Sequence, residues 1–142
     1  SGYVNTSTET FVAYSFARTP GLIGVGTFTG VSGSADGRAV IINDGGSGFK
    51  PGFLVIKSIT AARYWVLHDS RRNPANPASI RTHPNTSESE NVSGTADIDF
   101  LANGFKIRNT SSHSGGESDT YIYLAFPENP FGGSGVAQAK AR

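Results

Sequence analysis

The sequence of 142 residues contains no cysteine and no methionine. Without cysteine, the chain has no disulfide, no thiolate metal ligand and no cysteine nucleophile. Because methionine is missing at position 1 as well, we expect the chain to be a processed product or a fragment of a longer protein. No apolar run reaches the roughly 18 residues of a membrane-spanning helix, so no membrane insertion is expected.

Charged residues are scarce and nearly balanced, since they make up 16% of the chain and the formal net charge is +1. A nucleic-acid-binding protein needs a clustered excess of Lys and Arg to neutralise phosphates, so we expect no nucleic-acid partner. Gly, Ser, Thr and Asn are abundant instead, and together they supply 56 of the 142 residues. This composition favours turns and leaves little room for helices.

Short runs rich in β-branched and aromatic residues recur along the chain, separated by turn-forming residues. We expect about eight strands, at residues 10–16, 23–29, 38–43, 53–59, 63–68, 95–101, 104–108 and 120–126. The dipeptides Asp36-Gly37 and Asn103-Gly104 are typical of hairpin turns. The sequence therefore predicts an all-β fold, an antiparallel β-sandwich that is jelly-roll-like.

Residues 70–93 interrupt this series of strands. They contain three of the seven prolines and almost no hydrophobic residues. We expect one long irregular loop here, lying on the surface between strands. A loop of this length is often functional, so contact with a ligand or a partner is the alternative interpretation.

The two ends of the chain resemble each other. Residues 9–20 read ETFVAYSFARTP and residues 119–130 read DTYIYLAFPENP, with identical Thr, Phe and Pro at an offset of 110. Chance, a tandem repeat with this period and an exchanged strand that adds to a neighbour's sheet are all open. We therefore divide the chain into an N-terminal strand, residues 1–20, and a β-sandwich domain, residues 21–142.

Four segments carry a resemblance to a known family. They are residues 48–57 (GFKPGFLVIK), 65–72 (WVLHDSRR), 99–107 (DFLANGFKI) and 120–131 (TYIYLAFPENPF). In this order they resemble the GFxPxFVxIK, WxxxDSxR, FLxNGFKL and TYIYxAFxENPF segments of a domain frequent in tail fibres and other structural proteins of tailed phages. The resemblance implies a β-rich fold, a virion or extracellular location, and an adhesive or structural role with no catalytic motif to carry over.

Aromatic and arginine side chains supply the candidate contacts with a ligand or partner. Tyr121 and Tyr123 share one face of a predicted strand, where they either stack on sugars or a neighbouring subunit or pack in the core. Tyr64 and Trp65 are neighbours and face opposite sides, so one should be buried and the other exposed. The candidate contact residues are Tyr64, Trp65, Arg71, Arg72, Arg81, Tyr121 and Tyr123.

Acidic residues give only weak signals. Asp97 and Asp99 share one strand face and are the calcium candidates, although a half-exposed strand explains the same pattern. Glu88 and Glu90 repeat this spacing in the long loop. The three histidines lack the spacing of a transition-metal site, so we expect no cofactor and no catalysis. Asp69 before Ser70 and Arg71 predicts a turn held by the aspartate side chain.

These observations predict a non-enzymatic module of a phage virion or fibre that is structural and recognises a bacterial surface glycan for host attachment. The first alternative is a purely structural, self-assembling subunit, such as a capsid decoration protein or a polymerising extracellular filament. The second alternative is a glycan-cleaving enzyme with two carboxylates in a deep cleft. Under the first two interpretations the main partner is the chain itself, as a trimer or a polymer.

Overall fold

The computed structural model describes residues 7–34, 36–92 and 98–131. In these ranges the chain forms β-strands and no helix, which confirms the all-β prediction. The strands are β1 (Gly24–Thr29), β2 (Ala39–Ile41), β3 (Pro51–Ser58), β4 (Val66–Asp69), β5 (Ile80–Arg81), β6 (Asn91–Val92), β7 (Ile98–Leu101), β8 (Gly104–Ile107) and β9 (Thr120–Pro127). Each predicted strand except 10–16 overlaps one of them.

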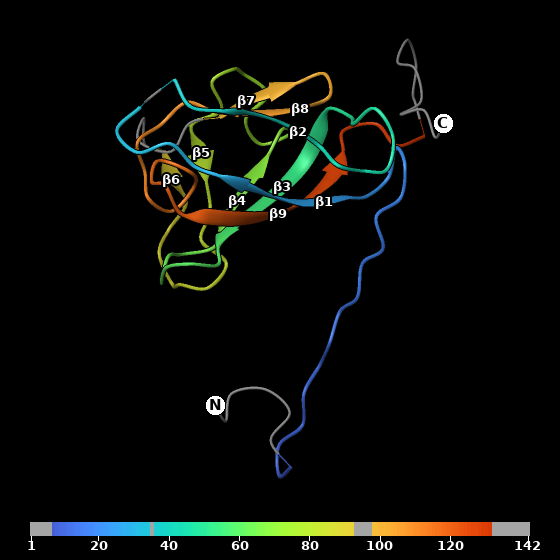
Figure 1. Cartoon of the computed structure of the whole chain (residues 1–142), viewed down its shortest axis with the longest axis vertical. Coiled ribbons are helices and arrows are strands. Elements are labelled where there is room, and N and C mark those ends of the chain that lie inside the picture. The colour runs from blue at the N-terminus through green and yellow to red at the C-terminus, as the bar shows by residue number, and fades with distance from the viewer. Residues whose placement is uncertain (1–6, 35, 93–97, 132–142) are drawn as a thin grey trace.

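The larger sheet contains four antiparallel strands in the order β1-β9-β3-β4. The last strand of the chain, β9, therefore lies between β1 and β3 (Figure 1). Its Ile122 lies opposite Thr27 of β1 on one side and Lys57 of β3 on the other. This position makes β9 the centre of the sheet surface that faces away from the core.

The smaller sheet contains three antiparallel strands in the order β2-β8-β7. The hairpin between β7 and β8 pairs Leu101 with Gly104, so the predicted Asn103-Gly104 turn lies at its tip. Gly104 also lets β2 approach closely, because a Cβ at this position would lie 2.0 Å from the carbonyl oxygen of Val40. A side chain here would force the two strands apart.

The hydrophobic core lies between these two sheets. Phe28 of β1 contacts Phe105 of β8 edge-to-face at 5.6 Å between ring centroids, and Phe105 contacts Tyr123 of β9 at 5.5 Å. Burying each such side chain contributes roughly 1.5–3 kcal/mol to folding. The core residues are Phe28, Val40, Ile42, Phe49, Leu54, Ile56, Ala78, Ile98, Phe100, Phe105, Ile107, Tyr121, Tyr123 and Ala125.

Residues 70–92, the described part of the predicted loop, are more ordered than the sequence predicts. They include β5 and β6, which pair with each other, and they are attached to the sandwich by the bridges Leu67↔Thr82 and Ala78↔Ile98. The side chain of Asn76 makes two hydrogen bonds to the backbone of Phe100, at 2.9 and 3.0 Å. The prediction of one long irregular loop is therefore wrong, because these polar anchors replace the missing hydrophobic contacts.

The predicted strand at residues 10–16 is also absent. This segment forms no ladder with any other part of the described chain. A strand needs a neighbour for its backbone groups, and the described part of the fold supplies none for residues 10–16. We call residues 7–18 the arm, and Figure 1 shows them running away from the sandwich beside β1. Among the described residues, no helix is long and apolar enough to span a bilayer.

Candidate functional site

The outer face of the four-stranded sheet forms an apolar groove of about 640 Å³. Successive side chains of a strand point to opposite faces, and Tyr121, Tyr123 and Ala125 of β9 are buried in the core. The alternate residues Ile122 and Leu124 must therefore face outward. The groove is lined by Tyr14, Phe16, Val25, Gly26, Thr27, Val55, Lys57, Trp65, Ile122, Tyr123 and Leu124.

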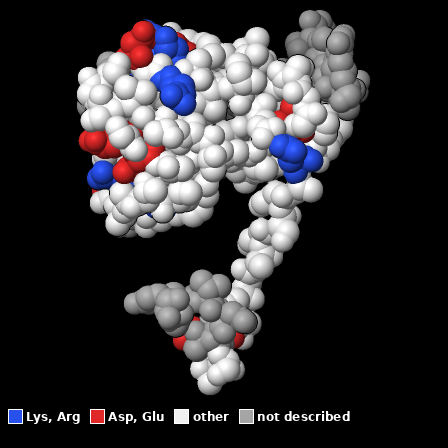
Figure 2. All heavy atoms as spheres, viewed as in Figure 1, with Lys and Arg blue, Asp and Glu red and all other residues white. Residues whose placement is uncertain are grey.

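The arm forms one wall of this groove through Tyr14 and Phe16. Phe16 packs edge-to-face against Phe126 at the end of β9, with 5.9 Å between ring centroids. The remaining apolar side chains of the arm are poorly covered, since Val12 is 77% exposed and Tyr14 is 83% exposed. Figure 2 shows the arm as a narrow and mostly uncharged projection from the sandwich.

The base of the arm is fixed by a buried carboxylate. Asp44 accepts hydrogen bonds from the backbone N–H groups of Gly21 (2.9 Å), Gly46 (2.7 Å) and Gly48 (3.2 Å). Burial acts to raise the pKa of Asp44, but these N–H groups together lower it below the ordinary value. Asp44 therefore joins the chain entering β1 to the glycine-rich loop before β3.

Trp65 lines the groove and is 40% exposed. Its backbone N–H donates to the side chain of Asn85 at 2.9 Å. Its neighbour Tyr64 is 38% exposed and stacks on the ring of His113, with 4.6 Å between centroids. Both aromatic residues are thus partly exposed, so the prediction that one of them is buried is wrong.

Behind Tyr64 lies a cluster of basic groups. Arg81 donates to His83 at 3.2 Å, and His83 makes a 2.9 Å hydrogen bond with the carbonyl of Trp65. Arg81 and His83 are both buried. Burial, together with the nearby charges of His83 and Arg81, lowers the pKa of His113. The prediction of Arg81 as a surface contact is therefore wrong, because β5 turns it into the protein.

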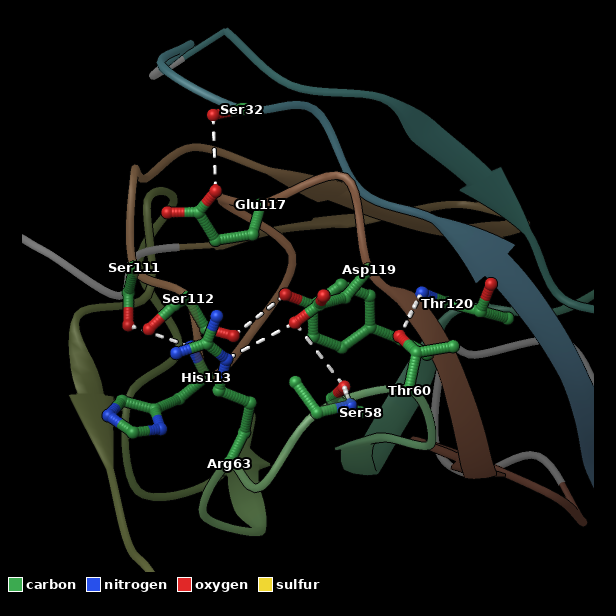
Figure 3. Close-up of polar contacts among 12 residues, drawn as sticks. Ser32, Ser58, Thr60, Arg63, Ser111, Ser112, His113, Glu117, Asp119 and Thr120 are labelled. Atoms are coloured by element: carbon green, nitrogen blue, oxygen red, sulfur yellow. Dashed lines mark hydrogen bonds and ion pairs between the residues drawn. The ribbon is translucent and has the colours of Figure 1, made fainter.

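A second polar network connects the loop after β3 to the start of β9. Asp119 accepts from Arg63 at 3.2 Å and from Ser58 at 3.4 Å, and the three side chains converge in Figure 3. Beside them, the hydroxyl of Thr60 accepts from the backbone N–H of Thr120 at 3.0 Å. These contacts hold the loops in place.

Among the described residues, no group of three or more His, Asp or Glu side chains is placed to hold a metal ion.

The two predicted loop arginines form separate contacts. Arg71 donates to the Asn129 side chain at 3.3 Å, and Arg72 forms an ion pair with Glu90. The backbone N–H of Arg71 donates to the Asp69 carboxylate at 2.8 Å, which confirms the predicted aspartate-held turn. Because both arginines have partners within the chain, their positions indicate a bracing role for this loop.

Tyr121 and Tyr123 do not form an exposed pair. Tyr121 is fully buried and donates to the carbonyl of Ser112 at 2.7 Å, while burial raises its pKa to about 12. The hydroxyl of Tyr123 accepts from the backbone N–H of Asn43 at 2.7 Å. Stacking of this pair on sugars is therefore ruled out by their burial, and core packing is the alternative that the structure shows.

Of the two calcium candidates, Asp97 and Asp99, the structure describes one. Asp97 lies outside the described residues. Asp99 lies on β7, where its carboxylate is 3.5 Å from the guanidinium of Arg108. That contact accounts for the charge of Asp99 without a metal ion.

Sequence reasoning missed the groove residues Val55, Ile122 and Leu124. A signal for them was present, because FLVIKSI (residues 53–59) and TYIYLAF (120–126) are apolar at nearly every position. Such a strand is covered on both faces, whereas a half-exposed strand alternates with polar residues. The second apolar face of the sheet is thus the feature that most needs a functional explanation.

A family model described as a domain of unknown function, DUF7483, matches residues 1–130. The chain belongs to the DUF7483 family. The matched range includes the arm as well as all the described strands. No curated protein and no solved structure matches the chain.

Proposed function

We propose that this DUF7483 chain is a non-enzymatic structural module of a phage particle or a similar extracellular fibre, and that it works by associating with copies of itself. The observation that carries the proposal is the apolar outer face of the four-stranded sheet. Ile122, Leu124, Val25 and Val55 meet there with Trp65. An apolar surface of this kind on a soluble domain is typical of a protein–protein contact.

The four segments that resemble phage structural proteins support a structural role. Three of them meet at one end of the large sheet. Lys50 pairs with Glu128 at 2.8 Å, and the backbone N–H of Ser70 donates to the carbonyl of Gly52 at 2.8 Å. Arg71 from the second segment reaches Asn129. The residues of the resemblance are thus used to build the sandwich.

The strand order also fits the jelly-roll architecture that we propose for the sandwich. In a jelly roll the first and last strands are neighbours in one sheet, as β1 and β9 are here. The second and the penultimate strands, β2 and β8, are neighbours in the other sheet. The hairpin of β3 and β4 departs from the simplest form of this pattern.

Recognition of a host-surface glycan has weaker support. Glycan binding would need several exposed aromatic and arginine side chains on one surface. Of the candidate contact residues, however, Tyr121, Tyr123 and Arg81 are buried. Among the candidate contact residues, Trp65 is the one that both lines the groove and is partly exposed. One partly exposed indole is as well suited to a protein contact as to a sugar.

Glycan cleavage has the least support. An inverting or retaining glycosidase holds two carboxylates about 5–10 Å apart across its substrate. Among the described residues that line the groove there is no Asp and no Glu. Glu90 is held by Arg72, and Asp99 by Arg108.

The mass of the purified chain in solution tests the proposal. We expect light scattering to give an oligomer at micromolar concentration and a smaller species on dilution. A variant with a charge in the groove, Ile122→Lys, should be shifted to the monomer. The matched control is Ile41→Lys, because Ile41 of β2 is also exposed but lies on the other sheet. A wild-type chain that stays monomeric at high concentration contradicts the proposal.

A further inference from the structure

The arm has the chemistry of a β-strand but pairs with no strand among the described residues. Residues 10–17 make no backbone-to-backbone hydrogen bond with any other described residue. The sequence TFVAYSFA in this stretch contains no charge. Val12 and Tyr14 are 77% and 83% exposed. Leaving such side chains in water costs about 25 cal/mol for each Å² of apolar surface, so the arm gains free energy wherever it is covered.

The groove is the matching uncovered surface. Ile122 and Trp65 of its lining are 36% and 40% exposed. Lys57 is the one charged residue among the described lining residues, and its ammonium group donates to the carbonyl of Ser58 at 2.7 Å. The floor of the groove between Val55 and Leu124 is therefore apolar.

The arm and β9 share the same pattern of side chains. At the offset of 110 residues, Val12, Tyr14 and Phe16 correspond to the outward-facing Ile122, Leu124 and Phe126. We infer that the groove receives residues 10–16 of the arm of a second copy of this chain. This inference rests on the proposed self-association and names the segment that carries it.

The arm's own groove is a poorer site for it. The turn at Thr19–Ile23 and the bond from Gly21 to Asp44 fix the direction in which the arm leaves β1. Among the described residues of the arm, Phe16 is the one that makes a ring contact with the sheet, Tyr14 stays 83% exposed, and the arm runs away from the sandwich (Figure 1). In an extended conformation residues 10–16 span roughly 23 Å, which is enough to cross a neighbour's four-stranded sheet.

The area involved suits a stable contact. Tyr14 and Phe16 are 83% and 49% exposed, and a fully buried aromatic side chain removes about 150–250 Å² from water. Two reciprocally exchanged arms would therefore bury roughly 800 Å² from these rings and Val12, before the groove surfaces are counted. Stable interfaces begin at about 1,200 Å² in total. Reciprocal exchange gives a closed dimer, whereas a head-to-tail arrangement gives a polymer.

A synthetic peptide of residues 7–18 tests the contact directly. The receptor is the full chain with Val12→Ser and Tyr14→Ser, which removes the arm's most exposed anchors and leaves the sheet side of the groove, with Val25, Val55, Ile122 and Leu124, unchanged. Trp65 is the sole tryptophan of the chain and lines the groove, so its fluorescence reports occupancy. We expect a saturable blue shift, and about tenfold or more weaker binding for a peptide with the same two serine substitutions.

Complementation of two defective chains separates exchange between copies from folding back within one copy. One chain carries Val12→Ser and Tyr14→Ser, and the other carries Ile122→Lys. We expect each alone to be monomeric and an equimolar mixture to form a one-to-one complex, because one intact arm meets one intact groove. Thr27→Lys, at an exposed groove position opposite Ile122, is a second groove variant in case Ile122→Lys disturbs folding. Ile41→Lys is the matched control and should not impair association.

The outcomes distinguish the two proposals. If the wild-type chain associates but neither the peptide nor the complementing pair binds, the arm inference is overturned while self-association stands. If the wild-type chain is monomeric and the peptide still shifts Trp65 with no dependence on chain concentration, the arm folds back onto its own groove, and both proposals fail. Binding in both experiments supports them together.

Discussion

Phe16 and Phe126 contact each other edge-to-face, and they occupy equivalent positions in the two similar ends of the chain. Phe126 also contacts Phe53 of β3, at 6.0 Å between centroids. The base of the arm is thus attached to the centre of the large sheet through one ring. The rest of the arm, including Val12 and Tyr14, stays largely exposed.

Removing this ring should free the arm without unfolding the sandwich. For Phe16→Ala we expect a loss of about 1 kcal/mol or less in the free energy of unfolding, because an aromatic pair contributes roughly 0.5–1.5 kcal/mol and Phe16 is half exposed. Limited proteolysis should cut the arm faster. Val12→Ala, which removes an exposed side chain beyond this contact, should leave the rate of cutting at the base unchanged. Equal rates for wild type and Phe16→Ala would show that the contact does not hold the arm.

Replacing the carboxylate at the base of the arm should cost more. Asp44→Asn keeps the shape of the side chain but loses the charge that accepts from Gly21, Gly46 and Gly48. Hydrogen bonds to a charged group contribute about 1.5–3 kcal/mol, so we expect a loss of about 2 kcal/mol in urea unfolding at pH 7. The control is Asp36→Asn, whose carboxylate is well exposed beside Lys106 and Arg108 and should change stability little.

Acid should weaken the Asp44 contact in the wild type. Its pKa is lowered in the folded chain, so its contribution is present above the ordinary carboxyl pKa of 3.8 and is lost as the pH falls through the lower folded value. The Asp44→Asn chain should lose this part of the acid sensitivity. An identical decline in both chains would mean that Asp44 is not charged in the folded protein.

The strands of the sandwich could be predicted from the sequence because they depend on local patterns. Alternating apolar runs and turn dipeptides predict β7, β8 and the hairpin between them. The face that each strand buries could not be predicted for β9, because Tyr121 and Ile122 are equally suited to a core. The ring contact of Tyr121 with Phe28, at 5.2 Å, decides between them, and that contact joins residues far apart in the chain.

The conformation of the arm and the burial of Arg81 could not be predicted from local sequence either. Residues 10–16 have the composition of a strand, yet strand formation needs a neighbouring backbone, and none of the described residues provides one. Arg81 looks like a surface residue by type, yet it is buried because His83 accepts its hydrogen bond. In both cases contacts between residues far apart in the chain decide whether a segment forms a strand or a side chain is buried. The local sequence does not reveal these contacts.

The buried His68 should make stability depend on pH in the mildly acidic range. Burial lowers its pKa to about 4, and the neighbouring Arg81 and His83 act in the same direction, against a hydrogen bond with Ile80. In the unfolded chain the pKa is about 6.5. Between pH 6.5 and 4, His68 is therefore protonated in the unfolded chain and neutral in the folded chain. The free energy of unfolding falls as the pH falls through this window.

The effect of His68 should be on the order of 3 kcal/mol across the window, from about 1.4 kcal/mol for each pH unit. Urea unfolding at several pH values measures it. His68→Leu should flatten the slope between pH 6.5 and 4, even if the variant is less stable at every pH. His113→Leu, at a partly exposed histidine, should keep most of the slope. A His68→Leu chain with the wild-type slope would show that another group causes the acid sensitivity.

The glycine that opens the GFKPGF segment should tolerate no side chain, for two separable reasons. Gly48 has φ of +77°, and a Cβ there would lie 2.4 Å from the carbonyl oxygen of Asn103. Gly33 has a similar φ of +72° but open space around it, so Gly33→Ala measures the backbone cost alone, about 1 kcal/mol. Gly48→Ala should cost clearly more in urea unfolding, because the loop before β3 must also move away from the β7–β8 hairpin. Equal losses for the two variants would show that this close approach contributes nothing to the stability of the sandwich.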